Sequence, residues 1–456
     1  MTKWQPTEGI VATNELMDII NCDSSVSVLA GAGAGKTELL AQKANYLLHT
    51  DKCLWPKKIL CLSFKTEAQA NIKNRVNKRC GVKADRFDSY TFHAFSKSIV
   101  DRFKNVLPEN KRPLNNYDIV MKENQANGLD KVWMGSLVNL AIEIIKSRED
   151  VCNLFSMSYS HVFIDEFQDT TNSQYRLLQE LFKGKGTILL AVGDINQSIM
   201  LWADARTTAF EDFTNDFVAQ RKLLLCNYRA TLEIQSVLNV LLQFVENHQQ
   251  PLTVTNQKIT NCELIYFPNE LSETNHLIAY IQNLIATGVG EAEICVLTEQ
   301  QSSQYTEKLR SELSRKGIKN LDMTDLQDTL KEPLGVMFSL LFKLYVNNDP
   351  HSYTELCDYY LALNKVKHGD DKEEELTKQL SEHIYKQKSN IVGHQSADSI
   401  ITLIKTSLKY FGIKKIKGRW KQYKSGEFFK FVWRNLELHL RNTINETQSL
   451  KDASLD

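Results

Sequence analysis

The sequence predicts an α/β fold in which a parallel sheet carries helices on both faces. Predicted strands alternate with predicted helices through residue 230, a glycine-rich loop joins the first strand to a long helix, and a later apolar strand ends in two adjacent carboxylates. Such alternation is typical of parallel sheets, because each crossover returns the chain through a helix. We therefore expect functional side chains at the carboxyl edge of this sheet.

The glycine-rich loop reads Ala-Gly-Ala-Gly-Ala-Gly-Lys-Thr and joins a β-rich run at residues 25–29 to a helical pattern at residues 39–48. Its glycines can adopt positive φ and let backbone N–H groups approach an anion, toward which the dipole of the following helix also points. The pattern predicts a phosphate cradle, in which Lys36 reaches the β and γ phosphates and Thr37 ligates Mg²⁺. The octet alone also fits a flexible Gly/Ala turn, because Ala30 stands where the strict pattern has glycine. The cradle comprises Ala30, Gly31, Ala32, Gly33, Ala34, Gly35, Lys36 and Thr37.

A second candidate element is the run HVFIDEFQD at residues 161–169, an apolar strand that ends in paired carboxylates. An aspartate at the carboxyl end of a parallel strand is well placed to hold Mg²⁺ through water, and this position is taken by Asp165. The neighbouring Glu166 is placed to orient and deprotonate an attacking water. By itself, such a junction is more often a strand that runs into a solvated turn.

Two further apolar runs end in polar side chains that suit the same chemistry. The run at residues 187–192 leads to Gln197, a neutral side chain that can sense a γ phosphate without quenching its charge. The run at residues 223–225 leads to Tyr228, which offers a flat face for adenine, and to Arg229, a forked cation for transition-state charge. Without the other elements, Tyr228 would be interpreted as core.

Taken together, six blocks resemble those of the UvrD/Rep/PcrA-type superfamily 1 DNA helicases, in the same order. They are AGAGAGKT (30–37), LSFKTEAQ (62–69), YTFHAF (90–95), FIDEFQDT (163–170), VGDINQSI (192–199) and LLCNYRA (224–230). The blocks cover about the first half of the chain. The resemblance implies a RecA-like P-loop NTPase core, with ATP and Mg²⁺ as cofactors and 3′ to 5′ movement on single-stranded DNA.

The resemblance also assigns roles residue by residue. It implies catalytic roles for Lys36, Glu166, Gln197 and Arg229, in addition to the nucleotide and metal contacts described above. Contacts to single-stranded DNA, made by rings that stack on bases and short polar groups that hold phosphates, are implied for Phe64, Thr91, His93 and Trp202. From the residues alone, Phe92 and Phe95 fit an ordinary core, and His93 fits a structural histidine.

The chain departs from the family pattern at two places within the matched half. Leu16 stands where the family carries the glutamine that reads adenine, so adenine selectivity is not predicted. Around Trp202, the family has a further stacking ring and an arginine, whereas this chain reads Met-Leu-Trp-Ala-Asp-Ala at residues 200–205. We expect weaker DNA contact there than in a typical member.

Beyond residue 230 the sequence has neither the threonine-x-histidine-x-x-lysine-glycine block nor the valine-alanine-x-threonine-arginine block of the family. The second supplies an arginine that can be worth about 10³ to 10⁵ in rate. The chain is therefore expected to be a fragment or a short form that needs a partner, and to hydrolyse ATP poorly alone. Three functions stay open: a helicase or translocase acting on single strands or single-strand/duplex junctions, a helicase-like subunit of an anti-phage system that works with a nuclease, and an inactive truncated copy.

Composition fits a cytoplasmic protein with local rather than global attraction to DNA. Lysine plus arginine and aspartate plus glutamate each number 55 in 456 residues, so any basic surface must be a local patch. Nine dispersed cysteines without a CxxC pair are typical of reduced thiols. We find no run of about 18 apolar residues and expect no membrane contact.

The length suggests about three domains, and the family order divides them further. The expected parts are 1–96 and 159–246 for the first RecA-like domain, 97–158 for a helical insertion, 247–330 for a partial second RecA-like lobe, and 331–456 for a helical region. In the partial lobe we predict strands at 264–267 and 294–298 around a helix at 277–285. In the last part, residues 405–434 interleave basic and aromatic side chains, which fits duplex phosphates and a lysine-coated helix pair equally well.

Overall fold

The computed structural model describes residues 4–115, 117–198, 205–238, 265–299, 301–346, 349–366, 370–389, 396–424 and 426–447. The chain divides into two compact units, Met1–Leu264 and Ile265–Asp456.

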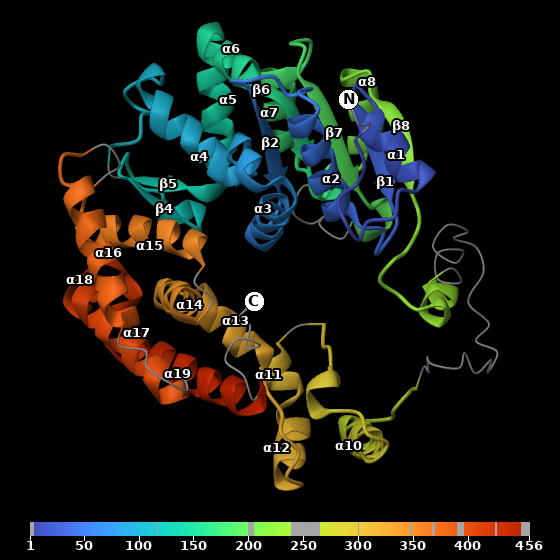
Figure 1. Ribbon diagram of the computed structural model, residues 1–456, viewed down its shortest axis with the longest axis vertical. Coiled ribbons are helices and arrows are strands. Elements are labelled where there is room, and N and C mark those ends of the chain that lie inside the picture. The colour runs from blue at the N-terminus through green and yellow to red at the C-terminus, as the bar shows by residue number, and fades with distance from the viewer. Residues whose placement is uncertain are drawn as a thin grey trace. The chain divides into compact units, whose positions relative to one another are not determined.

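The first unit is built on a six-stranded sheet in which every pairing is parallel (Figure 1). Its order is β3-β2-β6-β7-β1-β8, which places β1 between β7 and β8. The loops that leave the carboxyl ends of β1, β6 and β7 therefore meet at one edge. The strands are β1 Val26–Ala30, β2 Lys58–Ser63, β3 Phe87–Thr91, β6 Tyr159–Ile164, β7 Ile188–Gly193 and β8 Gln220–Leu224.

Helices cover both faces of this sheet, which confirms the predicted α/β class. Alternate side chains of β2 enter different cores: Ile59 and Cys61 pack with the helices of one face, Leu60 and Leu62 with those of the other. This is the two-residue period of a strand buried on both sides. The first face carries α1 Asn14–Asn21, α2 Lys36–His49 and α3 Thr66–Cys80. The second carries α4 Phe92–Phe103, α5 Leu137–Ser147, α6 Glu149–Ser158, α7 Asn172–Phe182 and α8 Ala209–Asp216.

The expected helical insertion at 97–158 also contains a small sheet. Two strands of three residues, β4 Asp118–Val120 and β5 Lys131–Trp133, pair in parallel between α4 and α5. Strands this short cannot be predicted from the alternation of apolar and polar residues, because three residues are too few to show a period of two.

The second unit is helical in its described residues, and most of its core lies after residue 330. Helix α14 is apolar around most of its circumference, as expected for a helix buried among others. Helices α14, α15 and α16 lie within residues 331–456, the region expected to be helical. The helices of the second unit are α10 Glu270–Ala286, α11 Ser302–Tyr305, α12 Glu307–Arg315, α13 Met323–Lys331, α14 Pro333–Val346, α15 Pro350–Leu363, α16 Glu373–Ser389, α17 Ala397–Phe411, α18 Ile413–Arg419 and α19 Glu427–Thr447.

The predicted strands at 264–267 and 294–298 are wrong for the residues that the structure describes. Residues 265–267 and 294–298 pair with no strand there, although helix α10 lies between them as expected. A strand needs a neighbour that completes its backbone hydrogen bonds, and the described part of this unit supplies none. Tyr266 and Leu297 are accordingly 85% and 89% exposed.

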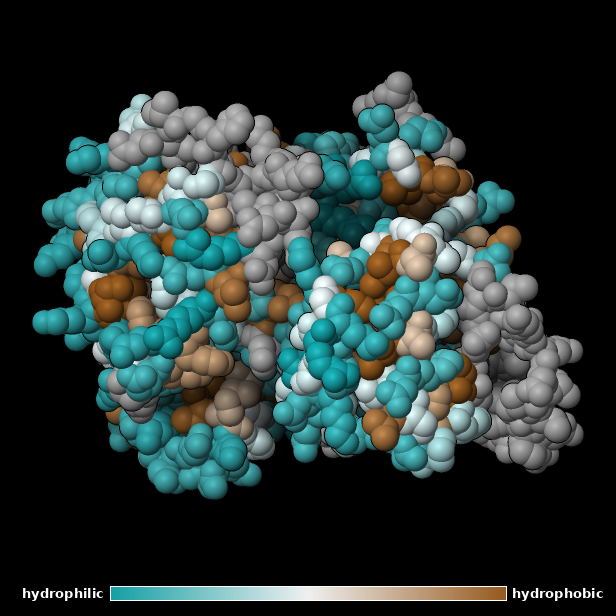
Figure 2. Space-filling view, turned by 90° about the horizontal axis from the view of Figure 1, so that it is seen from below, coloured by the Kyte–Doolittle hydropathy of each residue, from teal (hydrophilic) through white to brown (hydrophobic). Residues whose placement is uncertain are grey.

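Hydrophobic residues reach the surface in scattered groups among hydrophilic ones on the face that Figure 2 draws. Such a mixture is normal for a folded surface. Among the described residues, no helix combines the length and the apolar character that a membrane span requires.

Candidate functional site

The glycine-rich loop connects β1 to α2, and its backbone requires glycine at two positions. Gly33 and Gly35 have φ of +69° and +82°, in the left-handed region that side chains rarely adopt. A Cβ on Gly33 would also lie 2.4 Å from Asn227 Oδ1. The loop is therefore packed closely against the segment after β8, where the N–H of Tyr228 donates to the Gly33 carbonyl at 3.0 Å.

Helix α2 begins at Lys36 and presents an uncapped amino end to this loop. Gly35 is its N-cap and contributes no side-chain hydrogen bond, so the backbone N–H groups of the first turn need a partner from elsewhere. Thr37 is the second residue of the helix and lies on the same turn. A free helix amino end next to a glycine loop is a suitable place for an anion.

One residue further on, Glu38 fixes α2 against α3. Its carboxylate accepts from Arg75 Nη1 at 2.8 Å and lies 3.0 Å from Arg79 Nε. Gln42 Nε2 donates to the same group at 2.7 Å. The sequence reasoning gave Glu38 no role, because its two arginine partners come from a different helix.

The lysine of the loop contacts the acidic pair at the end of β6. Lys36 Nζ lies 2.9 Å from Glu166 Oε2, and the same oxygen accepts from Gln168 Nε2 at 2.9 Å. Glu166 has φ of +50°, an unusual conformation for a residue with a side chain. This turn brings its carboxylate toward the loop, so two blocks separated by 130 residues meet at one point.

Asp165 is buried at the same edge, and Lys36 and the Glu166 N–H compensate its charge only in part. The residue is only 4% exposed, and its Oδ1 has no hydrogen-bond partner among the described residues. Burial, followed by the neighbouring Glu166, raises the pKa of Asp165 to about 7. A carboxylate in this position is stabilised by a cation, and carboxylate oxygen is the ligand that Mg²⁺ prefers.

Gln168 links the acidic pair to the end of β7. Its Oε1 accepts from the N–H of Asp194 at 3.1 Å, and Asp194 Oδ2 accepts from Gln197 Nε2 at 3.0 Å. Burial raises the pKa of Asp194. A continuous set of contacts thus runs from Lys36 to Gln197. Gln168 was missed at the sequence level, although it lies inside the acidic block, since its role depends on a neighbouring strand.

Asp169 is a second buried acid that sequence reasoning did not single out. Its Oδ1 has no hydrogen-bond partner in the part of the chain that the structure describes. Burial, followed by the charge of Glu166, raises its pKa. Three carboxylates with raised pKa, at residues 165, 169 and 194, therefore lie around the carboxyl ends of β6 and β7.

Tyr228 and Arg229 lie in the turn after β8. Asn227 Oδ1 accepts from the N–H groups of Arg229 and Ala230, both at 2.9 Å, which holds the turn. Both side chains are exposed, and Tyr228 is 60% accessible. Helix α1 lies beside this segment, because Glu15 Oε2 accepts from the Leu225 N–H at 3.3 Å.

Leu16 is part of the hydrophobic core rather than of this exposed surface. It is 9% exposed, and its N–H donates to the Thr13 hydroxyl that caps α1 at 3.2 Å. An apolar side chain at this position offers no hydrogen bond to a base.

Three of the residues expected to contact DNA lie at or just after the ends of the neighbouring strands β2 and β3, which are paired at Ser63 and Thr91. Phe64 follows β2 and is half-buried. Thr91 caps α4 by accepting from the Ala94 N–H at 3.2 Å. His93 is partly buried, and burial lowers its pKa. Trp202 lies outside the described residues.

Phe92 and Phe95 are buried in the core, as the residue-only interpretation predicted. Their exposed fractions of 2% and 1% leave neither ring available for stacking on a base.

Parts of the chain are similar to known DNA helicases. A model described as the UvrD/REP helicase N-terminal domain matches residues 12–133 and 108–218. A probable DNA helicase II homolog of Mycoplasma capricolum is 23% identical over 374 residues, which cover 67% of this chain and 50% of that protein. The ATP-dependent DNA helicase PcrA of Bacillus subtilis is 24% identical over 351 residues, which cover 63% and 47%.

The chain therefore spans about half the length of the curated relatives it matches. Among solved structures, the Pif1 helicase from Candida albicans matches over 62% of this chain and 56% of that chain, with 16% identity and a TM-score of 0.29.

Proposed function

Since residues 12–218 match the UvrD/REP helicase N-terminal domain, we propose that the carboxyl edge of the first unit's sheet binds ATP with Mg²⁺. We propose further that hydrolysis of this ATP drives 3′ to 5′ movement along single-stranded DNA. The observation that carries the proposal is the contact between Lys36 and Glu166 beside Asp165, whose buried Oδ1 has no hydrogen-bond partner among the described residues.

The residues present fit such a nucleotide. The uncapped end of α2 and the close approach at Gly33 suit phosphate oxygens. Asp165 and Thr37 are the groups that would hold Mg²⁺, which when bound neutralises charge on the phosphates. Tyr228 offers its exposed ring to the base, and Leu16 offers no polar group, so the base contact rests on stacking.

In this scheme, nucleotide binding separates Lys36 from Glu166, and each then contacts a new partner. Without nucleotide, their side chains neutralise each other at 2.9 Å. A phosphate that enters the loop attracts the lysine, because it carries more charge than one carboxylate. Glu166 is thereby released to accept a proton from water, while Gln168 keeps its carboxylate oriented. Gln197 and Arg229 are left to contact the γ phosphate.

Single-stranded DNA is proposed to pass over the ends of β2 and β3. Phe64 would stack on a base, while Thr91 and His93 would contact the sugar–phosphate chain. Trp202 is proposed as a further stacking ring on the strength of the family pattern alone.

Rapid turnover is proposed to need a second lobe that supplies another arginine to the γ phosphate. The two sequence blocks that build this part in the family are not found in the sequence. Residues 247–330 are proposed as the beginning of that lobe and residues 331–456 as its helical insertion. The rest would come from additional chain or from a protein partner.

The proposal is tested by the melting temperature and the hydrolysis rate of the purified chain with ATP and Mg²⁺, with and without single-stranded oligonucleotide. We expect ATP to raise the melting temperature, and the oligonucleotide to raise the rate. Lys111→Ala, which removes a surface ion pair with Glu143, is the control and should behave like the wild type. Equal rates with and without DNA would contradict movement on DNA, and the absence of any ATP effect would contradict the nucleotide site.

A further inference from the structure

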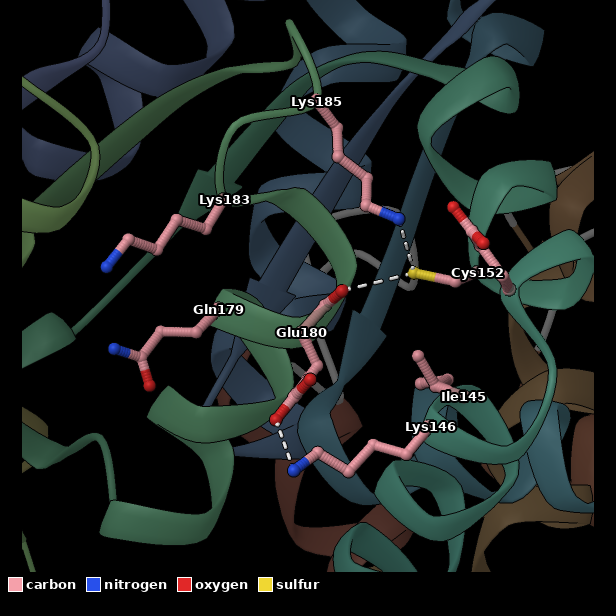
Figure 3. Close-up of a pocket in the computed structure, with 8 residues that line it drawn as sticks. Ile145, Lys146, Cys152, Gln179, Glu180, Lys183 and Lys185 are labelled. Carbon is pink, nitrogen blue, oxygen red and sulfur yellow. Dashed lines mark hydrogen bonds and ion pairs between the residues drawn. The ribbon is translucent and has the colours of Figure 1, made fainter.

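A hollow of about 760 Å³ lies on the first unit, away from the proposed nucleotide site (Figure 3). It is formed by α5, α6, α7 and the connection from α7 to β7. This connection precedes β7, so the hollow lies near the amino end of that strand, whereas the nucleotide site lies at the carboxyl ends. The lining residues are Ile145, Lys146, Glu149, Cys152, Gln179, Glu180, Lys183 and Lys185.

Within this hollow, a lysine amine contacts a cysteine sulfur. Lys185 Nζ lies 3.0 Å from Cys152 Sγ and 3.1 Å from Asn153 Oδ1, which holds the amine beside the sulfur. The thiol donates to the Glu180 carbonyl at 3.1 Å. Cys152 is only 4% exposed, so the sulfur reacts with small reagents that enter the hollow rather than with large ones.

The other two lysines of the hollow are engaged elsewhere. Lys183 pairs with Asp216 at 2.7 Å, and Lys146 pairs with Glu180 at 3.0 Å. Figure 3 shows Lys185 directed toward the sulfur and Lys183 directed away from it. Lys183 is therefore a natural control for Lys185.

We propose that Cys152 and Lys185 form an oxidative modification site, in which peroxide joins Sγ to Nζ. Hydrogen peroxide first oxidises the thiol to a sulfenic acid and releases one water. The nitrogen lone pair of the Lys185 amine then attacks the sulfur, the S–O bond breaks, and a second water leaves with the proton lost from nitrogen. In sum, one thiol, one amine and one peroxide give one S–N bond and two waters. Sulfur is oxidised and peroxide oxygen is reduced.

The geometry favours this outcome over further oxidation. A sulfenic acid goes on to the sulfinic acid unless a nucleophile captures it first. Lys185 is already in contact with the sulfur, and its connection to the sheet contains Gly184 and Gly186, where a Cβ would meet nothing within 4 Å. This open surface connection leaves room for the small approach that bond formation needs.

The bond would close a loop between positions 33 residues apart, and would tie α6 to the connection before β7. A cross-link of this kind restricts the unfolded chain and stabilises the fold. We expect the linked form to melt about 5 °C above the reduced form.

The test is mass spectrometry of tryptic peptides after the purified chain has been treated with hydrogen peroxide in the absence of nucleotide. We expect one cross-linked peptide that contains Cys152 and Lys185, about 2 Da lighter than the sum of the Cys152 peptide and the Lys185 peptide left uncleaved after Lys185, and its loss on treatment with a thiol reductant. The link should be absent from Cys152→Ser and Lys185→Arg, and should form normally in Lys183→Arg. Exposed Cys226 and Cys295 report that the peroxide dose was sufficient.

Three results would overturn the proposal. One is a Cys152 that stays unmodified while Cys226 and Cys295 are oxidised. Another is a Cys152 recovered as sulfinic acid with Lys185 free, and the third is an equal yield of link in Lys185→Arg. Unchanged melting temperatures of the reduced variants show that each has folded. Because no nucleotide is present, the result is independent of the proposed function.

Discussion

Buried polar groups are handled differently at the carboxyl edge of the sheet and in the helical core of the second unit. At the sheet edge, Asp165 and Asp169 each have a carboxylate oxygen without a hydrogen-bond partner among the described residues. In the helical core, Ser407 Oγ lies 2.6 Å from Tyr345 OH and 3.1 Å from His383 Nε2, so all three groups are paired. The difference fits the proposed nucleotide site, which needs charge at the sheet edge, whereas the helical core uses its polar groups to fix its own packing.

The largest expected effect is the loss of ATP hydrolysis when Glu166 is replaced. Glu166→Gln keeps the shape of the site but removes the proposed proton acceptor, so the rate of ATP hydrolysis should fall by about 10² to 10⁴-fold. ATP should still raise the melting temperature, because the phosphate contacts remain. The comparison with Lys36→Ala, which should lose both effects, separates chemistry from binding. Hydrolysis at the wild-type rate in Glu166→Gln would show that another group is the base.

A smaller effect is expected at Asp165, where a substitution should increase the stability of the fold instead of decreasing it. Asp165→Asn removes a buried charge that its neighbours compensate only in part, and should raise the free energy of unfolding of the nucleotide-free chain at pH 8 by about 1 to 3 kcal/mol. Urea unfolding of both proteins measures the difference. A less stable variant would show that Asp165 is already compensated.

The pH dependence of this difference follows from the raised pKa of Asp165, about 7 against an ordinary 3.8. Between these values the folded state binds more protons than the unfolded state, so this group's contribution to stability falls as pH rises from about 4 to about 7. The gain from Asp165→Asn should therefore grow over that window and level off above it. A gain that is constant from pH 4 to 8 would contradict the raised pKa.

In the helical core, removal of a buried polar group should lower the free energy of unfolding instead of raising it. Ser407→Ala leaves Tyr345 OH and His383 Nε2 without their shared partner, and should lower the free energy of unfolding by about 1 to 3 kcal/mol. Adding Tyr345→Phe should recover part of this loss, since one of the two stranded groups disappears. A neutral Ser407→Ala would remove the contrast between the two regions.

The smallest effect is expected at Thr91, where a proposed DNA contact also caps α4. Thr91→Ala should cost about 1 kcal/mol of stability. Thr91→Ser keeps the capping oxygen and is the matched control. Binding of a labelled single-stranded oligonucleotide then shows whether the hydroxyl has a second role. If Thr91→Ala and Thr91→Ser bind DNA equally, the proposed DNA contact of the hydroxyl is wrong.

The α/β core was predictable because its signals are local. The run at 25–29, the glycine loop and the helical pattern that follows it each occupy adjacent residues, and they appear as β1, the loop and α2. The sequence also placed polar residues after β6 and β7. Since parallel strands end at one edge, their proximity followed from the fold class alone.

What could not be predicted depends on partners distant in sequence. Gln168 gains its role from Asp194 on the next strand, and Glu38 from arginines on α3. Residues 294–298 have the composition of a strand, but composition cannot supply the neighbouring strand that pairing requires. The unpaired oxygen of Asp165 likewise reflects burial in three dimensions rather than a pattern.

The most direct test of the central claim is the change in melting temperature on addition of a slowly hydrolysed ATP analogue, with Mg²⁺ or with a chelator, for the wild type and for Lys36→Ala. A nucleotide site at the sheet edge predicts a rise in the wild type that requires Mg²⁺ and is lost in Lys36→Ala, with Lys111→Ala unaffected. An equal rise in the wild type and Lys36→Ala, or no rise in either, would contradict it.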